Sequence, residues 1–377
     1  MRRKFSNAAR FQFFTRILLA QALILLVVTS GSSRSPQAQI GAPDPSPEDS
    51  VRISVLGLFH PREVIVNAFP GQAIVLHFGK ETLVLERSSG LDSATIRSSS
   101  DGLIVSVGSR VIPAMALACS GRGDDAVDFM LTIPDKITRH YHGTLQIQPS
   151  ARSLSAVVTM DRETAVASVV AAESGPDTPL EALKAEAIAA RTYLVAARGR
   201  HHDFDFCDTT HCQFLREPPA TTSAAAIAAS STRALVLAYG SQPFAAMYTR
   251  SCSGRTRTPA ELGLPSATYP YYSVECKYCR DHPVHWTRRI SRQDASSLRS
   301  SNESARLIVD RRLGWDMIPS DAFKIEKAAD HITLRGVGEG HGIGLCQAGA
   351  KAMAHDGAGF QQILNHYYPN TTIISWQ

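Results

Sequence analysis

The sequence predicts an α+β protein, with a β-rich region over residues 51–150 and a mixed region over residues 151–377. Residues 51–150 contain short runs of alternating apolar and polar residues separated by turns rich in Gly, Asp and Ser, which is typical of half-buried strands. After residue 150, apolar residues recur at helical spacing between isolated strand-like runs. The chain has 377 residues, enough for two domains or for one domain with elaborations.

Residues 1–31 have the pattern of an export signal. A basic start precedes an apolar run over residues 17–28, and small residues follow. About a dozen apolar residues is typical of a signal peptide and short for a membrane span, which needs roughly 20. The segment is therefore either a cleaved signal peptide or a retained N-terminal anchor, which would be the only contact with a membrane. Residues 32–50, rich in Ser, Pro and Gln, predict a flexible linker. We expect an exported protein of the periplasm or cell envelope.

The β-rich region carries no obvious chemistry and is either a scaffold or a binding module. Its strand pattern is clearest in the runs 51–59, 63–69, 73–78, 81–86, 102–108, 128–133 and 144–148.

A strand over residues 154–160 is expected to lead into a helix that is capped near Asp161 and ends at Glu173. The chain then breaks at Ser174-Gly175-Pro176. A second helix follows, with Thr178 as the N-cap, Pro179 at the first helical position and Glu181 closing a capping box. This arrangement places one carboxylate at an elbow between two helices.

The second helix is expected to direct two cations beside that elbow. Lys184 and Arg191 are seven residues apart, nearly two turns, so both project from one stripe of the helix. Glu186 is two residues from Lys184, and we expect it on the opposite, solvated side.

The remaining periodic segments alternate between helix and strand. They are an Ala-rich helix within 220–231, a hairpin in 235–256, a strand at 332–338 and a helix over 347–355. Between the last two, GVGEGHGIG over residues 336–344 fits neither the dinucleotide-binding nor the phosphate-loop spacing, so nucleotide binding is unsupported. The formal net charge of +5 is modest and spread along the chain, which argues against nucleic acid as a partner.

Four ordered motifs resemble the SpoIID/LytB family of peptidoglycan lytic transglycosylases and amidase enhancers. They are VVAAESGPDTPLEALKAEAIAARTY (169–193), CDTTHCQ (207–213), GHGIGLCQAGA (340–350) and ILNHYYPNTTI (363–373). The stretch 141–160 also fits the strands that precede them. The resemblance implies a SpoIID-like catalytic domain over residues 151–377.

The resemblance also implies an activity and a set of site residues. The expected reaction is lytic transglycosylation, which cleaves the MurNAc–GlcNAc bond of peptidoglycan strands free of stem peptides and leaves 1,6-anhydro-MurNAc ends. Glu173 would be the single acid/base, since no second carboxylate with the spacing of a hydrolase pair is evident. The residues expected to bind the substrate are Lys184, Arg191, Tyr248, Ser251, His341 and Gln347.

The cysteines leave more than one interpretation open. Cys207, His211 and Cys212 are suitable zinc ligands, with His201 or His202 as the fourth, and the resemblance supports structural zinc there. A Cys207–Cys212 disulfide is the alternative in an oxidising compartment. Cys276 and Cys279 have the spacing of a metal knuckle that Cys252 could join, or one of them pairs with Cys252 in a disulfide.

Two other functions compete with the transglycosylase. One is a non-catalytic cell-wall protein that enhances an N-acetylmuramoyl-L-alanine amidase. The other is a zinc hydrolase that uses the His and Cys residues at 201–212. A role in sporulation is not assumed.

Overall fold

The computed structural model describes residues 49–151, 153–265, 268–298, 303–314 and 317–376. The predicted signal or anchor at 1–31, and the linker up to residue 48, lie outside these ranges. Residues 45–377 form one compact unit. Within the described ranges, no helix is both long enough and apolar enough to cross a membrane.

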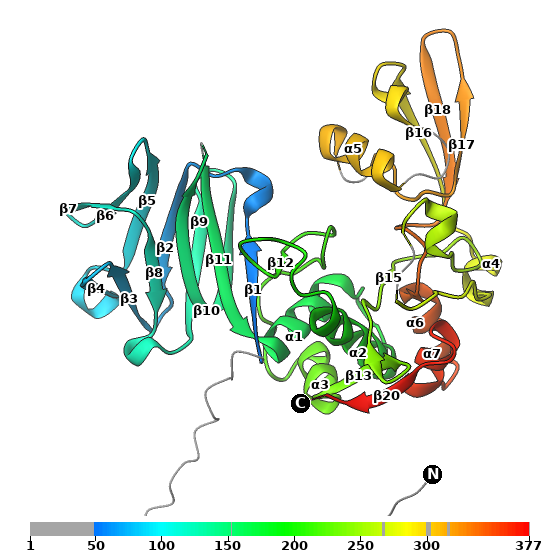
Figure 1. The fold of residues 1–377 in the computed structure, drawn as a ribbon, viewed down its shortest axis with the longest axis horizontal. Helices are drawn as coiled ribbons and strands as arrows, with labels where there is room; N and C mark the ends of the chain where they lie inside the picture. Colours follow the sequence, from blue (N-terminus) through cyan, green and yellow to red (C-terminus); the bar gives the residue numbers. More distant parts are fainter. Residues whose placement is uncertain (1–48, 152, 266–267, 299–302, 315–316, 377) are drawn as a thin grey trace, which may run out of the picture. The chain divides into compact units, whose positions relative to one another are not determined.

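The first part of the described chain is an antiparallel half-barrel. Its strands are β1 (Ser50–Val55), β2 (Glu63–Ala68), β3 (Ala73–Phe78), β4 (Glu81–Glu86), β5 (Ser93–Ser99), β6 (Gly102–Val107), β7 (Arg110–Ala114), β8 (Leu117–Ser120), β9 (Val127–Ile133), β10 (Ile137–Ser150), β11 (Ser153–Asp161) and β12 (Phe206–Cys207) (Figure 1). The path of paired strands runs β12-β1-β11-β10-β9-β2-β5-β6-β7, and β8 joins β10 to the β3–β4 hairpin. Within this sheet only the short β12 pairs in parallel, with β1.

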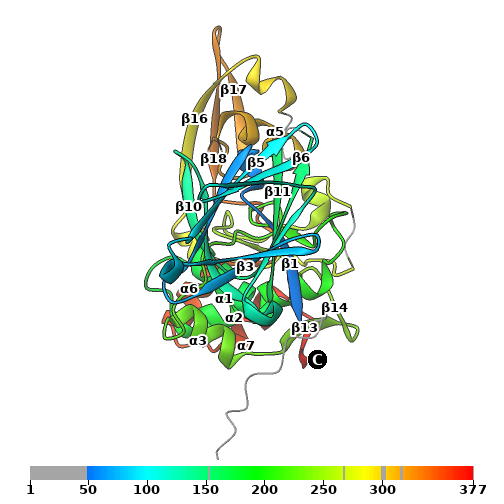
Figure 2. The same cartoon turned by 90° about the vertical axis from the view of Figure 1, so that its left-hand side faces the viewer.

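The long strand β10 lets the sheet curl. Its first half, up to Gly143, pairs with β9, and its second half pairs with β11 and β8. Gly143 has a φ of +150°, and a Cβ there would clash with the Thr159 carbonyl on β11, so only glycine fits the bend. Figure 2 shows β3 lying across the direction of β10 and β11.

The sequence located most of these strands but missed four, which are β5, β7, β8 and the two-residue β12. β8 has only four residues, and β5 is mostly polar, with the small Ala94 and Ile96 as its buried residues. β7 ends the strand order and contains Pro113, which an edge strand tolerates because its N–H side is unpaired. β11 extends the sheet past residue 150 and leads directly into the first helix.

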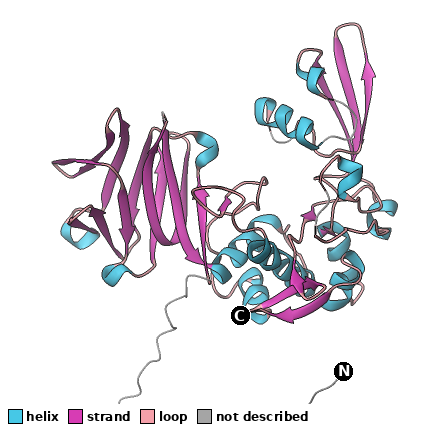
Figure 3. Ribbon diagram, in the orientation of Figure 1, coloured by secondary structure: helices cyan, strands magenta, loops and turns pink. Residues whose placement is uncertain are grey.

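Three helices follow the half-barrel: α1 (Arg162–Glu173), α2 (Leu180–Ala196) and α3 (Ala224–Ser231) (Figure 3). The prediction for α1 is confirmed, because the Asp161 carboxylate accepts the N–H groups of Glu163 and Thr164 and the helix ends at Glu173. The predicted start of α2 is wrong. Pro179 takes the N-cap position.

The predicted capping box between Thr178 and Glu181 does not form in this part of the described chain. The Thr178 hydroxyl donates instead to the Gly175 carbonyl, which closes the elbow. The Glu181 carboxylate accepts from Lys184 and from the Phe360 N–H.

Helix α2 is buried on two sides, which decides where its charged residues point. Leu183, Ala187 and Leu194 pack in one core with the half-barrel, α1 and α3. Ala185 and Ile188 pack in a second core, formed with the C-terminal segments. Small alanine side chains allow this close packing on both sides.

The second core is assembled from segments far apart in the sequence. β13 (Leu235–Tyr239) pairs with β14 (Gln242–Pro243) and β20 (Thr372–Ser375), and β15 (Tyr248–Thr249) pairs in parallel with β19 (Leu345–Cys346). The helices are α4 (Lys277–Asp281), α6 (Gln347–His355) and α7 (Phe360–Tyr367). The helix predicted over 347–355 is confirmed with its bounds, and residues 235–243 form the predicted hairpin.

Residues 282–338 form an inserted unit that the sequence only partly indicated. β16 (His285–Ser291), β18 (His331–Val337) and β17 (Phe323–Lys327) make a three-stranded antiparallel sheet, accompanied by α5 (Glu303–Leu313). The unit has a small core of its own, which includes Trp286, Val309 and Leu334. Only β18 was predicted.

Candidate active site

A pocket of about 330 Å³ lies at the elbow between α1 and α2. It is lined by Glu173, Ser174, Gly175, Pro176, Thr178, Ala182, Glu186, Arg250, Leu345, Gln347, Ala348, Ala350 and Lys351. The elbow, α2, the turn after β15 and the start of α6 therefore meet there. The pocket contains two carboxylates and two cations.

Glu173 is the half-buried last residue of α1, placed where its sequence motif predicted. Its Oε1 accepts the Phe214 N–H at 3.0 Å. Burial raises the pKa of Glu173 above its usual value, while the Phe214 N–H and the Arg250 charge act in the opposite direction. A carboxyl group in a pocket whose pKa is raised by burial is a candidate general acid.

Glu186 is the site residue that the sequence misassigned. The prediction of a solvated side chain is wrong, because Glu186 is only 3% exposed. It accepts hydrogen bonds from the Ser174 hydroxyl at 2.8 Å and the Gln347 amide at 3.0 Å. Burial raises the pKa of Glu186 to about 8, and the neighbouring Glu173 charge adds to the increase. The signal available was the run of alanines around Glu186, which indicates a helix with no solvated face.

Gln347 and Tyr248 lie beside the two carboxylates. Besides Glu186, the Gln347 amide approaches the Glu173 carbonyl oxygen at 3.5 Å. Burial and the charges of Glu173 and Glu186 raise the pKa of Tyr248 well above its usual value. Its buried hydroxyl has no hydrogen-bond partner among the residues that the structure describes. Both residues were predicted at the site, and their surroundings are compatible with that prediction.

Arg191 does not point into the pocket. Its side chain is fully buried and forms an ion pair with Glu163 at 2.5 Å. Its other N–H groups donate to the carbonyls of Ala229 at 3.0 Å and Leu235 at 3.1 Å. The predicted role in substrate binding is therefore corrected to a structural one, since the guanidinium is enclosed by α1, α3 and the chain entering β13.

Lys184 is also outside the set of pocket-lining residues. Its ammonium group pairs with Glu181 at 2.7 Å and lies 5.9 Å from the Phe360 ring centre. The cations that do line the pocket are Arg250 and Lys351, neither of which was predicted. Lys351 donates to the Pro176 carbonyl at 2.8 Å.

Ser251 and His341 support the framework around the pocket and are not among the lining residues. Ser251 is buried, and its backbone exchanges hydrogen bonds with Glu339. The His341 ring accepts the Ile343 N–H at 3.0 Å. The glycine loop is thus a tight turn packed against residues 247–251, and its contribution to the pocket comes through Gln347 at its end.

The predicted metal ligands form a His/Cys cluster consisting of His201, Cys207, His211 and Cys212. Their ligand atoms all lie within 4.8 Å of one another. The two sulfurs are 3.2 Å apart, and His211 Nδ1 is 3.7 Å from each of them. A zinc ion with bonds of about 2.0–2.3 Å fits such a set. His201 is therefore the candidate for the fourth ligand, whereas the His202 side chain is 98% exposed and pairs with Asp203.

Four other cysteines meet in the second core, in what we call the tetracysteine cluster: Cys252, Cys276, Cys279 and Cys346. All are buried, and their sulfurs lie within 4.8 Å of one another. The cluster could bind a structural metal such as zinc. The knuckle spacing of Cys276 and Cys279 and the addition of Cys252 were predicted. Cys346 was not.

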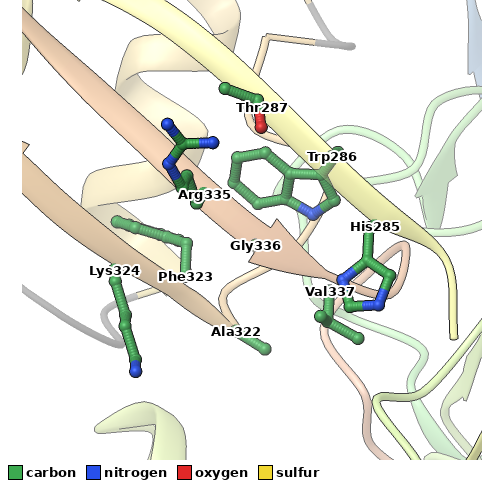
Figure 4. A pocket seen from close by; sticks show the side chains of 9 residues that line it. All are labelled: His285, Trp286, Thr287, Ala322, Phe323, Lys324, Arg335, Gly336 and Val337. Carbon is green, nitrogen blue, oxygen red and sulfur yellow. The ribbon is translucent and has the colours of Figure 1, made fainter.

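A larger pocket of about 540 Å³ lies on the inserted unit. Figure 4 shows side chains from its three strands around the opening, with Trp286 and Phe323 beside His285, Lys324 and Arg335. Its lining residues include no carboxylate, so it cannot supply the acid that the elbow pocket supplies. The elbow pocket is therefore the candidate active site.

The fold and the site together define an α+β protein with two neighbouring carboxyl groups at a helix–helix elbow. Residues 150–239, which hold both carboxylates and the His/Cys cluster, match the model of the SpoIID family, described as stage II sporulation protein. This match confirms the resemblance to the SpoIID family found in the sequence.

Three relatives have about a quarter of their aligned residues in common with this chain. An uncharacterized protein of Brachyspira hyodysenteriae is 27% identical over 269 residues, covering 63% of this chain and 73% of the relative. The stage II sporulation protein D of Bacillus subtilis is 27% identical over 254 residues, covering 55% and 73%. The amidase enhancer of Bacillus subtilis is 26% identical over 278 residues, and the aligned region spans 52% of this chain but only 38% of the enhancer.

Proposed function

We propose that this protein is a peptidoglycan lytic transglycosylase, exported to the cell envelope, that cuts the MurNAc–GlcNAc bond with Glu173 as its acid and base. The observation that carries the proposal is the position of Glu173, half-buried in the elbow pocket with a raised pKa. The match of residues 150–239 to the SpoIID family model supports the same choice of residue.

The reaction needs one group that first gives and then takes a proton. The Glu173 carboxyl protonates the glycosidic oxygen, and the C1–O bond breaks with its electron pair on that oxygen. The carboxylate then accepts the proton of the MurNAc 6-hydroxyl while O6 bonds to C1, which closes the 1,6-anhydro ring. Glu173 ends protonated as it began, and no water is consumed.

Glu186 assists this chemistry as a neutral neighbour. With a pKa of about 8 it is protonated at neutral pH, so it adds no negative charge beside Glu173. It is also held by Ser174 and Gln347, which leaves it poorly placed to activate water. The second carboxylate therefore does not turn the site into the usual hydrolase pair, in which a charged base or nucleophile faces the acid.

The positive charges of Arg250 and Lys351 suit a negatively charged substrate. They line the same pocket as Glu173 and carry the positive charge that the sequence had assigned to Lys184 and Arg191. The lactyl group of MurNAc without a stem peptide is a free carboxylate, which suits these two cations. The preferred substrate is accordingly a strand from which an amidase has removed the peptides.

The His/Cys cluster is proposed to hold a structural zinc ion. It lies outside the set of pocket-lining residues, and Cys212 is two residues before Phe214, whose N–H holds Glu173. Zinc bound there would fix this loop. Chelation should then unfold the loop and remove activity together, whereas a zinc hydrolase would lose turnover without a structural change.

The direct test is mass spectrometry of purified peptide-free glycan strands after digestion by wild type and by Glu173→Gln. We expect 1,6-anhydro-MurNAc ends from wild type and a loss of rate of about 10²–10⁴-fold in the variant, the usual contribution of a general acid or base. Lys184→Gln is the control and should cut like wild type. Reducing ends in place of anhydro ends would mean hydrolysis.

A second candidate function follows from the relative named amidase enhancer. In that case neither wild type nor Glu173→Gln cuts strands, and both stimulate a cell-wall amidase equally. Loss of stimulation in Glu173→Gln would count against the enhancer alternative.

A further inference from the structure

The tetracysteine cluster joins three separate parts of the chain at one point in the second core. Cys252 follows β15, Cys276 and Cys279 lie at the start of α4, and Cys346 ends β19. Cys279 and Cys346 are 67 residues apart in sequence, with the inserted unit between them, yet their sulfurs are 3.5 Å apart. A single point of convergence for four sulfurs is the geometry of a tetrahedral ion site.

The groups around the sulfurs are arranged for thiolates. The Cys252 N–H donates to the Cys346 sulfur at 3.3 Å. The Tyr367 hydroxyl is 3.4 Å from the Cys276 sulfur, and the Ser251 hydroxyl is 3.5 Å from the Cys279 sulfur. Donors of this kind orient metal-bound sulfur and reduce its negative charge. Among the described residues, no acid or histidine contributes a ligand atom to this set, which consists of the four cysteines.

Helix α6 is shaped to pack against the cluster. Gly349 lies within α6, where glycine costs about 1 kcal/mol relative to alanine. A Cβ at this position would lie 2.5 Å from the Cys276 sulfur and would clash with the Tyr367 hydroxyl. The glycine therefore keeps the start of α6 in contact with the sulfurs.

Two of the cysteines lie next to pocket residues. Cys346 directly precedes Gln347, whose amide binds Glu186, and Cys252 is two residues after Arg250. The Ala348 N–H also donates to the Arg250 carbonyl at 3.0 Å, which ties the two segments together. An ion that fixed these cysteines would fix both neighbours.

We propose that the tetracysteine cluster binds one structural zinc ion, and that this ion positions Gln347 and Arg250 in the elbow pocket. The site is distinct from the His/Cys cluster and does not depend on the proposed reaction. Four thiolates around one centre suit zinc, and sulfurs confined within 4.8 Å of one another leave room for a single ion. Gln347 and Arg250 are positioned through their neighbours, so the zinc has no contact with substrate.

The first test is the zinc content and X-ray absorption spectrum of the purified full chain. With both clusters filled we expect about two zinc ions per chain, with on average three sulfur and one nitrogen ligands per zinc. One zinc per chain with equal sulfur and nitrogen would mean that only the His/Cys cluster binds metal. That result would overturn the proposal. So would iron in place of zinc, or a protein mass lower by four hydrogens because these cysteines form two disulfides.

The second test uses Cys252→Ser, with Cys119→Ser as the matched control, since Cys119 is a buried thiol on β8 that belongs to neither cluster. Cys252→Ser should lose about one zinc per chain, and Cys119→Ser should lose none. If Cys252→Ser does not fold, the absorption spectrum of wild type still decides the metal site.

The positioning role has its own readout in hydrogen exchange. Amides at the start of α6 should exchange at least tenfold faster in Cys252→Ser than in Cys119→Ser, while amides of α1 stay unchanged. Equal exchange at α6 would overturn the positioning role and leave only a metal site.

Discussion

Glu186 and Arg191 lie on the same helix and are both buried, but their surroundings are opposite. Arg191 is matched by the carboxylate of Glu163 and by carbonyl groups at the end of α3. Glu186 accepts hydrogen bonds from the neutral side chains of Ser174 and Gln347 and has another carboxylate, Glu173, nearby. The charge of Arg191 is thus compensated by a carboxylate, whereas the hydrogen bonds that Glu186 accepts come from neutral donors.

This difference distinguishes a residue that stabilises the fold from residues that can take part in proton transfer. A buried cation with a bidentate partner is stable as an ion pair and has no reason to exchange protons. Burial raises the pKa of both Glu173 and Glu186, and a raised pKa is the property that a general acid requires. The comparison therefore assigns Arg191 to the fold and the two carboxyl groups to the site.

Replacing Arg191 should have the largest effect on stability. Arg191→Met removes the cation and leaves Glu163 buried without its partner, which typically costs about 3–5 kcal/mol. Urea unfolding of the variant measures this loss. Lys184→Met is the control on the same stripe and should cost less than about 1 kcal/mol, because its pair with Glu181 lies near the surface. A stable Arg191→Met protein with weakened substrate binding would return Arg191 to the site.

Glu186 should make stability depend on pH. The folded protein holds the Glu186 proton up to about pH 8, whereas the unfolded chain releases it near its usual value of 4.5. Between these values the folded state binds more protons, so the free energy of unfolding falls as pH rises. Each unit of pKa difference corresponds to about 1.4 kcal/mol.

Glu186→Gln isolates this contribution because the amide keeps the shape of the side chain without titrating. The variant should lose less stability than wild type between pH 5 and about 8, as measured by urea unfolding at several pH values. Parallel curves for the two proteins would show that Glu186 is not the titrating group. Glu163→Gln, at the partner of Arg191 on α1, provides the contrast.

The sequence was most informative where structure is decided locally. The cap at Asp161, the end of α1 at Glu173 and the bounds of α6 all follow from neighbouring residues, and all were predicted. The direction of the side chains on α2 was not predicted correctly. Residue spacing along a helix defines a stripe, but it does not show which element packs against that stripe. Alanines on both sides of α2 removed the apolar–polar contrast that would have shown which stripe is buried.

Long-range assembly accounts for the other misses. Cys346 joins Cys252 across 94 residues, and Lys351 reaches the Pro176 carbonyl across 175. No local pattern can report such contacts. The inserted unit was missed for a related reason, since its small core depends on pairing of strands that are individually polar on one face.

Arg250 allows the smallest and most specific test of the comparison, because it is an exposed cation that lines the pocket of Glu173 and Glu186. Its side chain is 65% exposed and lies 3.9 Å from Glu339. Since its charge lowers the pKa of Glu173, Arg250→Gln should shift the acidic group of the pH–rate profile to higher pH. It should also raise KM for peptide-free strands by no more than about fivefold, as expected for an exposed charge pair. The KM effect should shrink at high salt because an exposed pair is screened.

The control is Arg233→Gln, which replaces an exposed arginine outside the pocket lining. An equal change in both variants would indicate general attraction to an anionic polymer, whereas a change in Arg250→Gln alone would place the substrate carboxylate beside Glu173.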